Sequence, residues 1–260
     1  MRYLCLSLIA ALAPLAACER GDRVANRTSP GAAQDPVPEF GSRAAGCQEL
    51  PSSEELRRLL KAVPSEAEVG GLFGGRMQWG AIVNRRGELC AVAVATDDPM
   101  AAWPGSQAIA KAKAYTANAF STDAQPLSTA RLYTLSQPGR SLWGAGAANP
   151  FNAECLIAPD ESSDLGKVCG GTIVFGGGVA LYRGETRMGG LGVSGDTACA
   201  DHEIAKRVRN AAGLNPSKGA SIDDIQYSSA DGASIYTHPL CPNTWRNGEK
   251  IGEEEPATEY

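Results

Sequence analysis

Hydrophobic residues along the chain follow two spacings, one typical of helices and one typical of strands. Helical spacing or composition marks four segments, at residues 54–62, 107–120, 127–135 and 200–212. Leu56, Leu59 and Leu60 share one face of the first segment, and a pair of serines before it can cap its N-terminus. The last segment ends at Gly213, a residue type that often terminates helices. The chain is therefore expected to contain four helices.

The segment 107–120 is the strongest helix prediction because it is rich in alanine and contains neither glycine nor proline. Ala108, Ala112, Tyr115 and Ala119 share one face of this helix. We expect this face of mostly small residues to lie close against a sheet.

Five short apolar runs predict strands, at residues 77–83, 89–95, 172–175, 179–182 and 188–193. The first two are joined by residues 84–88, and the last three are separated by short connections that contain glycine. Such connections are typical of hairpins, which join antiparallel strands. The order of elements therefore predicts an α+β domain with one five-stranded antiparallel sheet, in groups of two and three strands, and helices packed on it.

Residues 1–17 predict a signal peptide, because Arg2 is followed by an apolar stretch and by small residues before Cys18. The sequence Leu15–Cys18 resembles a bacterial lipobox, in which the cysteine is diacylated and becomes the mature N-terminus. Several acyl chains would anchor the protein stably. Because Glu19 rather than aspartate follows, we expect the periplasmic side of the outer membrane or the cell surface. The alternative is cleavage near Ala17, with Cys18 left as a thiol.

The rest of the chain divides into three parts. Residues 18–46 are rich in Ala, Gly, Ser, Pro and charge and lack hydrophobic periodicity, which predicts a flexible tether after the lipidated cysteine. Residues 47–245 contain every predicted element and are expected to form a single domain. Residues 246–260 contain five glutamates and are expected to form an acidic disordered tail.

The amino-acid composition indicates which cellular compartment and which kinds of partner to expect. The chain has 29 acidic and 24 basic residues and a formal net charge of −5, which argues against nucleic acid as a partner. Its 8 cysteines are more than a cytosolic protein usually keeps, and they indicate an oxidising compartment. Its 2 histidines exclude any site that needs three imidazoles.

Once Cys5 in the signal and Cys18 at the lipid position are set aside, six cysteines remain for disulfides: Cys47, Cys90, Cys155, Cys169, Cys199 and Cys241. Their connectivity is open, because six cysteines can pair in many ways. Spacing favours Cys155 with Cys169 across a polar loop. Cys47 lies just before the first helix and Cys90 in an early strand, so Cys199 and Cys241 would then pin the C-terminal segment to the domain. A metal held by cysteines is less favoured, since no C-x-x-C pair is present.

Three blocks of sequence resemble the GlcG/HbpS-like family, a haem-binding or haem-degrading domain. They are residues 79–92, the helix 110–120 with its K-A-x-T-A-like pattern, and residues 176–205 with the run GGLGVSGD. Residues 137–139, 149–150, 199–202 and 238–241 are similar to a longer, exported branch of the family. The resemblance implies haem or a similar planar tetrapyrrole as the cofactor and a homo-oligomeric assembly. The first helix contains no histidine, so a haem ligand that some relatives place there has no counterpart.

His202, beside Asp201 at the start of the last predicted helix, is the leading candidate for an axial haem ligand and therefore for a metal ligand. It could also act as a general base, and the alternative is a polar histidine at a helix start. His238 lies in a predicted loop. If Cys199 and Cys241 pair, His202 and His238 come close together and form a two-histidine cluster.

Four residues of the long helix are candidate pocket residues: Lys111, Lys113, Tyr115 and Asn118. The lysines are two positions apart and point in different directions, so at least one could lie at the edge of a pocket. Haem needs cations for its propionates, and Lys113 with Arg131 or Arg140 could supply them. The alternative is that the lysines lie on the surface and Tyr115 in the core.

Ser194 is a further candidate, because Asp201 and His202 follow it closely. Asp196 replaces the second glycine of a G-x-S-x-G nucleophile elbow, so a strand end followed by a helix cap is favoured over a hydrolase. The function that we favour is a membrane-tethered, exported, non-catalytic domain that binds haem or a similar tetrapyrrole as a sensor or scavenger. The alternatives are an enzyme that acts on a small metabolite and an oligomerising interaction module without a small ligand.

Overall fold

The computed structural model describes residues 44–156 and 162–254, which belong to one compact unit. The predicted signal peptide, the lipidation position Cys18, nearly all of the tether and the last residues of the tail lie outside the described residues. Each helix of the described residues is too short or too polar to span a lipid bilayer.

The main sheet has four antiparallel strands rather than five. They are β1 (Trp79–Asn84), β2 (Leu89–Val94), β3 (Gly178–Arg183) and β4 (Thr186–Ser194). Their order in the sheet is β2-β1-β4-β3, so the hairpins β1–β2 and β3–β4 meet at β1 and β4 in the centre. The α+β class and the antiparallel hairpins are therefore confirmed, and the number of strands is corrected.

The predicted strand at residues 172–175 does not form, because backbone groups in it and just before it bond to side chains outside the sheet. The Ile173 N–H donates to the hydroxyl of Thr116 at 2.9 Å, and the Asn149 amide donates to the carbonyl oxygen of Gly171 at 2.8 Å. Apolar content alone does not distinguish such a segment from a strand.

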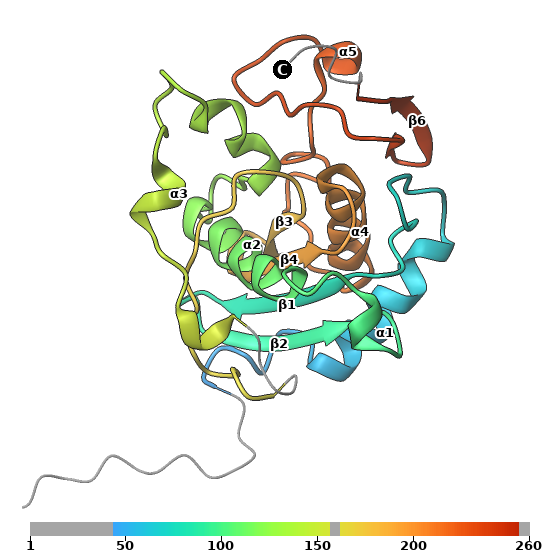
Figure 1. The fold of residues 1–260 in the computed structure, drawn as a ribbon. Helices are drawn as coiled ribbons and strands as arrows, with labels where there is room; N and C mark the ends of the chain where they lie inside the picture. Colours follow the sequence, from blue (N-terminus) through green and yellow to red (C-terminus); the bar gives the residue numbers. More distant parts are fainter. Residues whose placement is uncertain (1–43, 157–161, 255–260) are drawn as a thin grey trace, which may run out of the picture. The chain divides into compact units, whose positions relative to one another are not determined.

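Three helices cover the sheet: α1 (Ser53–Ala62), α2 (Ser106–Phe120) and α4 (Ala198–Ala211). Helix α2 packs on one face, while α1 and α4 pack on the other (Figure 1). The hydroxyls of Ser52 and Thr197 accept hydrogen bonds from backbone N–H groups in the first turns of α1 and α4, which fixes where these helices begin.

Helix α2 faces the sheet with a different set of alanines from the predicted one. Ala110, Ala114 and Ala117 are buried, whereas Ala108 is half-buried and Ala119 is exposed. The glycines of β4 determine this orientation: a Cβ at Gly192 would overlap the carbonyl oxygen of Ala110, and a Cβ at Gly190 would overlap that of Ala114. The helix backbone therefore lies directly on a strip of glycines.

The other elements of the described residues are short: η1 (Val63–Ser65), η2 (Pro99–Ala101), η3 (Thr129–Leu132), η4 (Thr134–Ser136), α3 (Ala145–Ala148), η5 (Ala153–Cys155), α5 (Ser228–Asp231), β5 (Thr244–Arg246) and β6 (Glu249–Gly252). The helix expected at residues 127–135 is thus two 3₁₀ turns. The hydroxyls of Thr129 and Thr134 bond to the backbone of Gly178 and Thr237, which competes with a regular helix.

The domain boundary predicted at residue 245 is wrong. Strands β5 and β6 pair as a second, two-stranded sheet, so residues 249–252 are part of the folded unit. The Asn247 side chain accepts a hydrogen bond from Lys206 of α4 at 2.9 Å, which ties this hairpin to the helix.

All six predicted cysteines form disulfides, in the pairs Cys47–Cys90, Cys155–Cys169 and Cys199–Cys241. The pairing that spacing favoured is confirmed. The third bridge joins the first turn of α4 to the C-terminal segment.

Candidate functional site

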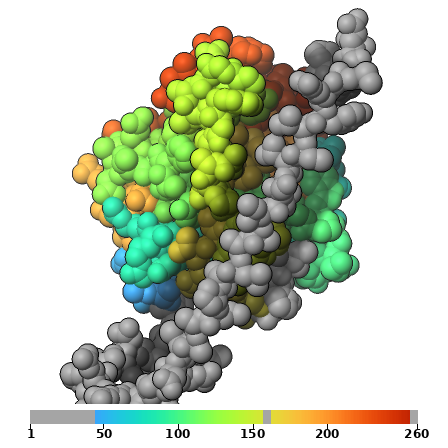
Figure 2. Space-filling model, turned by 60° about the vertical axis from the view of Figure 1, so that its left-hand side comes forward, coloured from blue at the N-terminus to red at the C-terminus, as the bar shows by residue number. Residues whose placement is uncertain are grey.

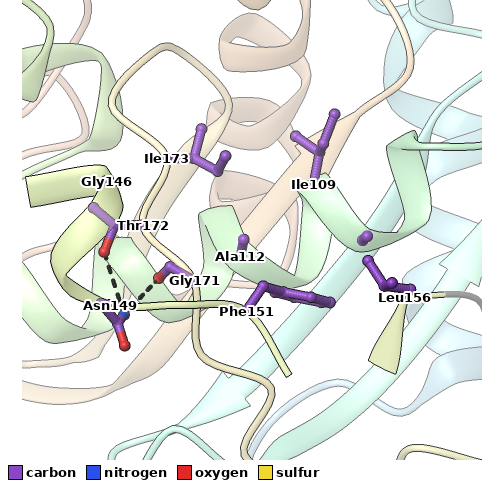
Figure 3. A pocket seen from close by; sticks show the side chains of 10 residues that line it. Ile109, Ala112, Gly146, Asn149, Phe151, Leu156, Gly171, Thr172 and Ile173 are labelled. Carbon is purple, nitrogen blue, oxygen red and sulfur yellow. Dashed lines mark hydrogen bonds between the residues drawn. The ribbon is translucent and has the colours of Figure 1, made fainter. Parts of the chain in front are cut away.

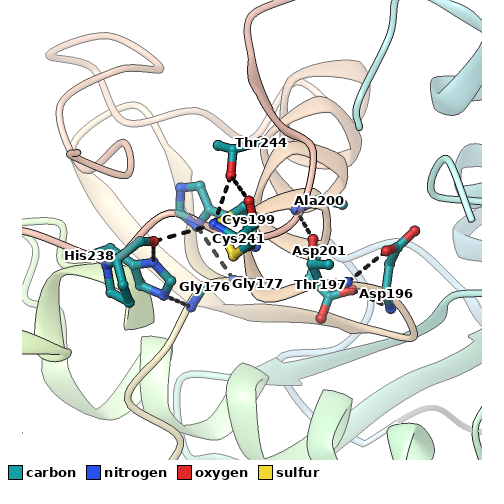
Figure 4. The surroundings of a disulfide bond; sticks show 12 residues. Gly176, Gly177, Asp196, Thr197, Cys199, Ala200, Asp201, His238, Cys241 and Thr244 are labelled. Atoms are coloured by element: carbon teal, nitrogen blue, oxygen red, sulfur yellow. Dashed lines mark hydrogen bonds between the residues drawn. A yellow bond between two sulfur atoms is a disulfide. The ribbon is translucent and has the colours of Figure 1, made fainter. Parts of the chain in front are cut away.

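The two histidines lie against consecutive backbone amides of the turn that precedes β3. The Gly176 N–H donates to His238 Nε2 at 3.2 Å (Figure 4). The Gly177 N–H donates to His202 Nδ1 at 3.5 Å. Glycine is required at position 176, because a Cβ there would overlap the carbonyl oxygen of Ala198 at the start of α4. The glycine turn therefore brings a loop, a helix and both imidazoles together.

The Cys199–Cys241 bridge explains how His238 reaches this place. Cys199 belongs to the first turn of α4, where it is fixed opposite Cys241, three residues after His238. The Cys199 N–H donates to Cys241 Sγ at 3.3 Å. The proximity of His202 and His238 that the sequence predicted on condition of this bridge is present.

Both imidazoles are buried in their neutral form. His202 is 0% exposed and His238 is 2% exposed. Burial, together with smaller effects of nearby His202 and Lys113, lowers the pKa of His238 to about 4, although the hydrogen bond to the Pro239 carbonyl oxygen opposes this shift. Burial likewise lowers the pKa of His202, although the Asp224 carboxylate opposes this effect.

The ring nitrogens of both histidines already face protein groups. Because His238 Nε2 accepts a hydrogen bond from Gly176, its Nδ1 carries the hydrogen and donates to the carbonyl oxygen of Pro239 at 2.7 Å. His202 Nε2 faces the carboxylate of Asp224 at 3.5 Å. An axial-ligand role for either residue requires this corner of the fold to open.

Lys113 forms a buried ion pair with Asp201 instead of lying at a pocket edge. Its Nζ donates to Asp201 Oδ2 at 2.7 Å and to the carbonyl oxygen of Val193 at 2.9 Å. The other oxygen of Asp201 accepts from Gln78 Nε2 at 3.1 Å and from the Asp196 N–H at 3.0 Å. Burial raises the pKa of Asp201 to about 7 and lowers that of Lys113, so this pair is held together at a desolvation cost.

Lys111 is equally buried, on another side of α2. Its Nζ donates to Asp164 Oδ2 at 2.6 Å, to Gln107 Oε1 at 3.2 Å and to the carbonyl oxygen of Cys155 at 3.0 Å. Arg131, which was expected to bind propionates, donates instead to the carbonyl oxygen of Asp224 at 3.0 Å. These cations hold the fold together and are not directed at a pocket.

The other predicted site residues are dispersed. The Asn118 amide donates to the carbonyl oxygen of Arg85 at 3.2 Å, and the ring of Tyr115 lies against Gly87. Ser194 is 4% exposed and pairs with Trp79 at the end of β4. Among the residues that the structure describes, no hydrogen bond joins Ser194 to Asp201 or His202, so no catalytic triad is assembled there.

An apolar groove lies over the outer face of α2 (Figure 3). It measures about 240 Å³, and its lining comprises Ala108, Ile109, Ala112, Gly146, Asn149, Phe151, Leu156, Gly171, Thr172 and Ile173. The segment that carries α3 forms one side of it, and this segment lies on the surface below the C-terminal segment, yellow-green below orange-red in Figure 2. The groove therefore presents a nearly apolar wall to solvent.

Sequence reasoning missed this groove, although two signals for it were present. Ala108 and Ala112 belong to the face that was expected to pack on the sheet, and the run Thr172–Phe175 was expected to be a strand. Because the sheet is covered by a different face of α2, half-buried Ala108 and the half-buried segment 172–175 meet at the surface, where Phe151 joins them; Ala112 lines the groove although it is only 4% exposed.

The fold and the groove define an α+β domain with a disulfide-fixed C-terminal extension and an apolar surface site. A family model described as "Haem degrading protein HbpS-like" matches residues 54–209, more than half of the chain. The chain belongs to this family.

Three solved structures are similar to the chain. Klebsiella pneumoniae protein ORFY shares 21% identity over 62% of this chain and 86% of its own, with a TM-score of 0.44. A PduOC–haem complex shares 25% identity over 62% of this chain and 91% of its own, with a TM-score of 0.43. A double mutant of Streptomyces reticuli HbpS shares 19% identity over 71% of this chain and 97% of its own, with a TM-score of 0.38. No curated protein matches the chain.

Proposed function

We propose that this chain is an exported, membrane-tethered domain that binds haem or a similar planar tetrapyrrole without transforming it, as a sensor or scavenger. The match to the haem-related family model over residues 54–209 carries the proposal. We place the ligand in the apolar groove over α2, where Ile109, Phe151 and Ile173 offer contacts to a flat apolar ring.

The lining of the groove suits the apolar ring of a tetrapyrrole but provides no ligand for its iron. None of the described residues that line it is a histidine, cysteine, methionine, tyrosine or lysine, so it supplies no axial donor. Its volume of about 240 Å³ is below the roughly 300–1,000 Å³ of most ligand pockets, so part of the ligand would remain in solvent. Binding therefore depends on contact with the ring.

Titration of the purified chain with hemin tests this assignment. Ala108→Trp fills the groove, because Ala108 is one of its lining residues. Ala119→Trp is the control: Ala119 lies eleven residues further along α2, on an exposed part of the same face. We expect Ala108→Trp to weaken hemin binding about tenfold, equivalent to about 1.4 kcal/mol. Ala119→Trp should leave it unchanged, as followed by the shift of the Soret band. Equal binding by both variants would remove the groove from the proposal.

The same titration decides the role of the histidines. If hemin binds in the groove, His202→Gln and His238→Gln should leave the Soret position unchanged, because both rings are buried against other protein groups. A displaced band in either variant would restore the axial-ligand prediction. Loss of the Soret band over time after addition of a reductant would contradict the non-catalytic part of the proposal.

The lipid anchor is tested at Cys18. We expect Cys18→Ser to abolish incorporation of labelled fatty acid and to move the protein from the membrane fraction to the soluble fraction, because the cysteine is the expected acylation position. Continued membrane association without the label would indicate another means of attachment. Sedimentation of the unlipidated chain tests the accompanying expectation of a homo-oligomer.

A further inference from the structure

The Cys199–Cys241 disulfide differs from the other two in its neighbours. The ligand atoms of Cys199, Cys241 and His238 all lie within 4.8 Å of one another, and all three residues are buried. Among the described residues, neither of the other disulfides has a third potential metal ligand this close. Two sulfur atoms and one imidazole nitrogen therefore already lie close enough together to become ligands of one metal ion after a small rearrangement.

The surroundings of these two sulfurs favour thiolates. Cys199 is in the first turn of α4, where the partial positive charge of the helix N-terminus stabilises an anion. The Cys199 N–H donates to Cys241 Sγ at 3.3 Å, so a backbone donor of this helix turn is directed at the sulfur pair. The imidazole of His238 is buried, and one of its ring nitrogens carries a lone pair, as a metal ligand requires.

The three residues would stay together if the disulfide opened, because other contacts hold the C-terminal segment. Arg209 of α4 forms two hydrogen bonds of 2.8 Å with Asp223, and Lys206 forms one of 2.8 Å with Asp224. The Gly71 N–H donates to the carbonyl oxygen of Asn243 at 2.9 Å, close to Cys241. Reduction would therefore leave the ligands approximately in place.

We propose that reduction of Cys199–Cys241 creates a Zn²⁺ site in which both thiolates and one ring nitrogen of His238 bind the ion. Two cysteines and a histidine, with water as the fourth ligand, are an established donor set for zinc.

A dithiol reductant supplies two electrons and two protons to the disulfide and is itself oxidised to a disulfide. Zinc then displaces the two thiol protons, and the His238 nitrogen exchanges its backbone partner for the ion. This corner of the fold would couple the redox state of the compartment to metal binding, independently of the groove over α2.

Competition between the chain and a chromogenic zinc chelator, before and after reduction with a phosphine, tests the proposal. We expect the oxidised chain to take up no Zn²⁺ at this site and the reduced chain to gain one tightly held ion. The double variant Cys199→Ser with Cys241→Ser should weaken that uptake about a hundredfold or more, and His238→Gln should weaken it about tenfold. The matched pair Cys155→Ser with Cys169→Ser removes a buried disulfide that lacks an imidazole, and it should retain the tight site. Equal zinc uptake by the two double variants would overturn the proposal.

Alkylation of the reduced chain, mapped by mass spectrometry, gives a readout that does not depend on any variant. Zinc should slow the labelling of Cys199 and Cys241 while Cys47, Cys90, Cys155 and Cys169 are labelled at their zinc-free rates. Uniform protection of all cysteines, or protection of none, would show that binding is not specific to this cluster and would reject the site.

Discussion

Lys111 and Lys113 are each 0% exposed, although lysine is among the residues least often buried. Their spacing predicted that they point in different directions, and this is confirmed by their separate partners, Asp164 and Asp201. The alternative of surface lysines is wrong. The carboxylates lie 53 and 88 positions further along the chain, so no local pattern could have identified them.

Removal of one charge from such a pair should be costly. In Lys113→Met, the Asp201 carboxylate remains buried without its cation, and we expect the free energy of unfolding to fall by about 3–5 kcal/mol. Urea denaturation followed by circular dichroism measures this change. The double variant Lys113→Met with Asp201→Asn should recover part of the loss, because no unpaired charge then remains.

Lys167 provides the control for this experiment. It forms an ion pair with Asp164 at 3.0 Å, but its side chain is 42% exposed. We expect Lys167→Met to change the free energy of unfolding by no more than about 1 kcal/mol. If Lys113→Met costs no more than Lys167→Met, the buried pair contributes nothing beyond an ordinary surface contact.

At the level of elements, alanines lie on several faces of α2, so the sequence alone does not predict which face of this helix packs on the sheet. The deciding residues are Gly190 and Gly192 of β4, which point toward α2 while Leu191 and Val193 point to the opposite face of the sheet. The run GGLGVSGD already contained this alternation of small and large residues. Its glycines form the surface on which the helix lies, in addition to carrying the family resemblance.

Replacement of Gly192 should separate the helix from the strand. In Gly192→Ala, the new methyl group would overlap the carbonyl oxygen of Ala110 and lie 2.8 Å from Lys113 Cβ, so backbone has to move. We expect a loss of about 3 kcal/mol in the free energy of unfolding, which thermal or urea denaturation would measure.

Gly105, the N-cap residue of α2, serves as the matched position. Its φ is −72° and a Cβ there would meet nothing within 4 Å, so Gly105→Ala should cost no more than about 1 kcal/mol. Similar losses for Gly105→Ala and Gly192→Ala would mean that the close helix–strand contact is not what limits substitution at Gly192.

The absence of the predicted fifth strand also depends on how elements distant in the sequence contact each other. Residues 172–175 have the composition of a strand, but Thr116, 57 positions earlier, accepts the hydrogen bond of the Ile173 N–H. Local periodicity predicts which residues are apolar and cannot reveal which backbone groups a distant side chain will satisfy. The same limit applies to the groove that this segment lines.

At the level of the whole molecule, the even number of cysteines after Cys18 implied up to three disulfides, and their spacing favoured Cys155–Cys169. The connectivity stayed open, so the proximity of the two histidines could be predicted only on condition that Cys199 and Cys241 pair, as they do. The glutamates after residue 246 indicate a solvated tail, but the domain boundary that they predict at residue 245 is wrong. Lys206 and Glu203 of α4 instead bind Asn247, and β6 pairs with β5.

Two truncations test where the folded unit ends. A chain that stops at residue 245 lacks β6 and both Asn247 contacts, at 2.9 Å to Lys206 and 3.1 Å to Glu203, whereas a chain that stops at residue 254 keeps them. Hydrogen bonds to charged groups contribute about 1.5–3 kcal/mol each. We therefore expect the shorter chain to melt at least about 4 °C below the full-length protein and the longer one to melt with it. Differential scanning calorimetry of the three chains, with the disulfides intact, measures the difference. Equal melting temperatures for both truncations would place the domain boundary at residue 245 and would mean that the β5–β6 hairpin does not contribute to the stability of the folded unit.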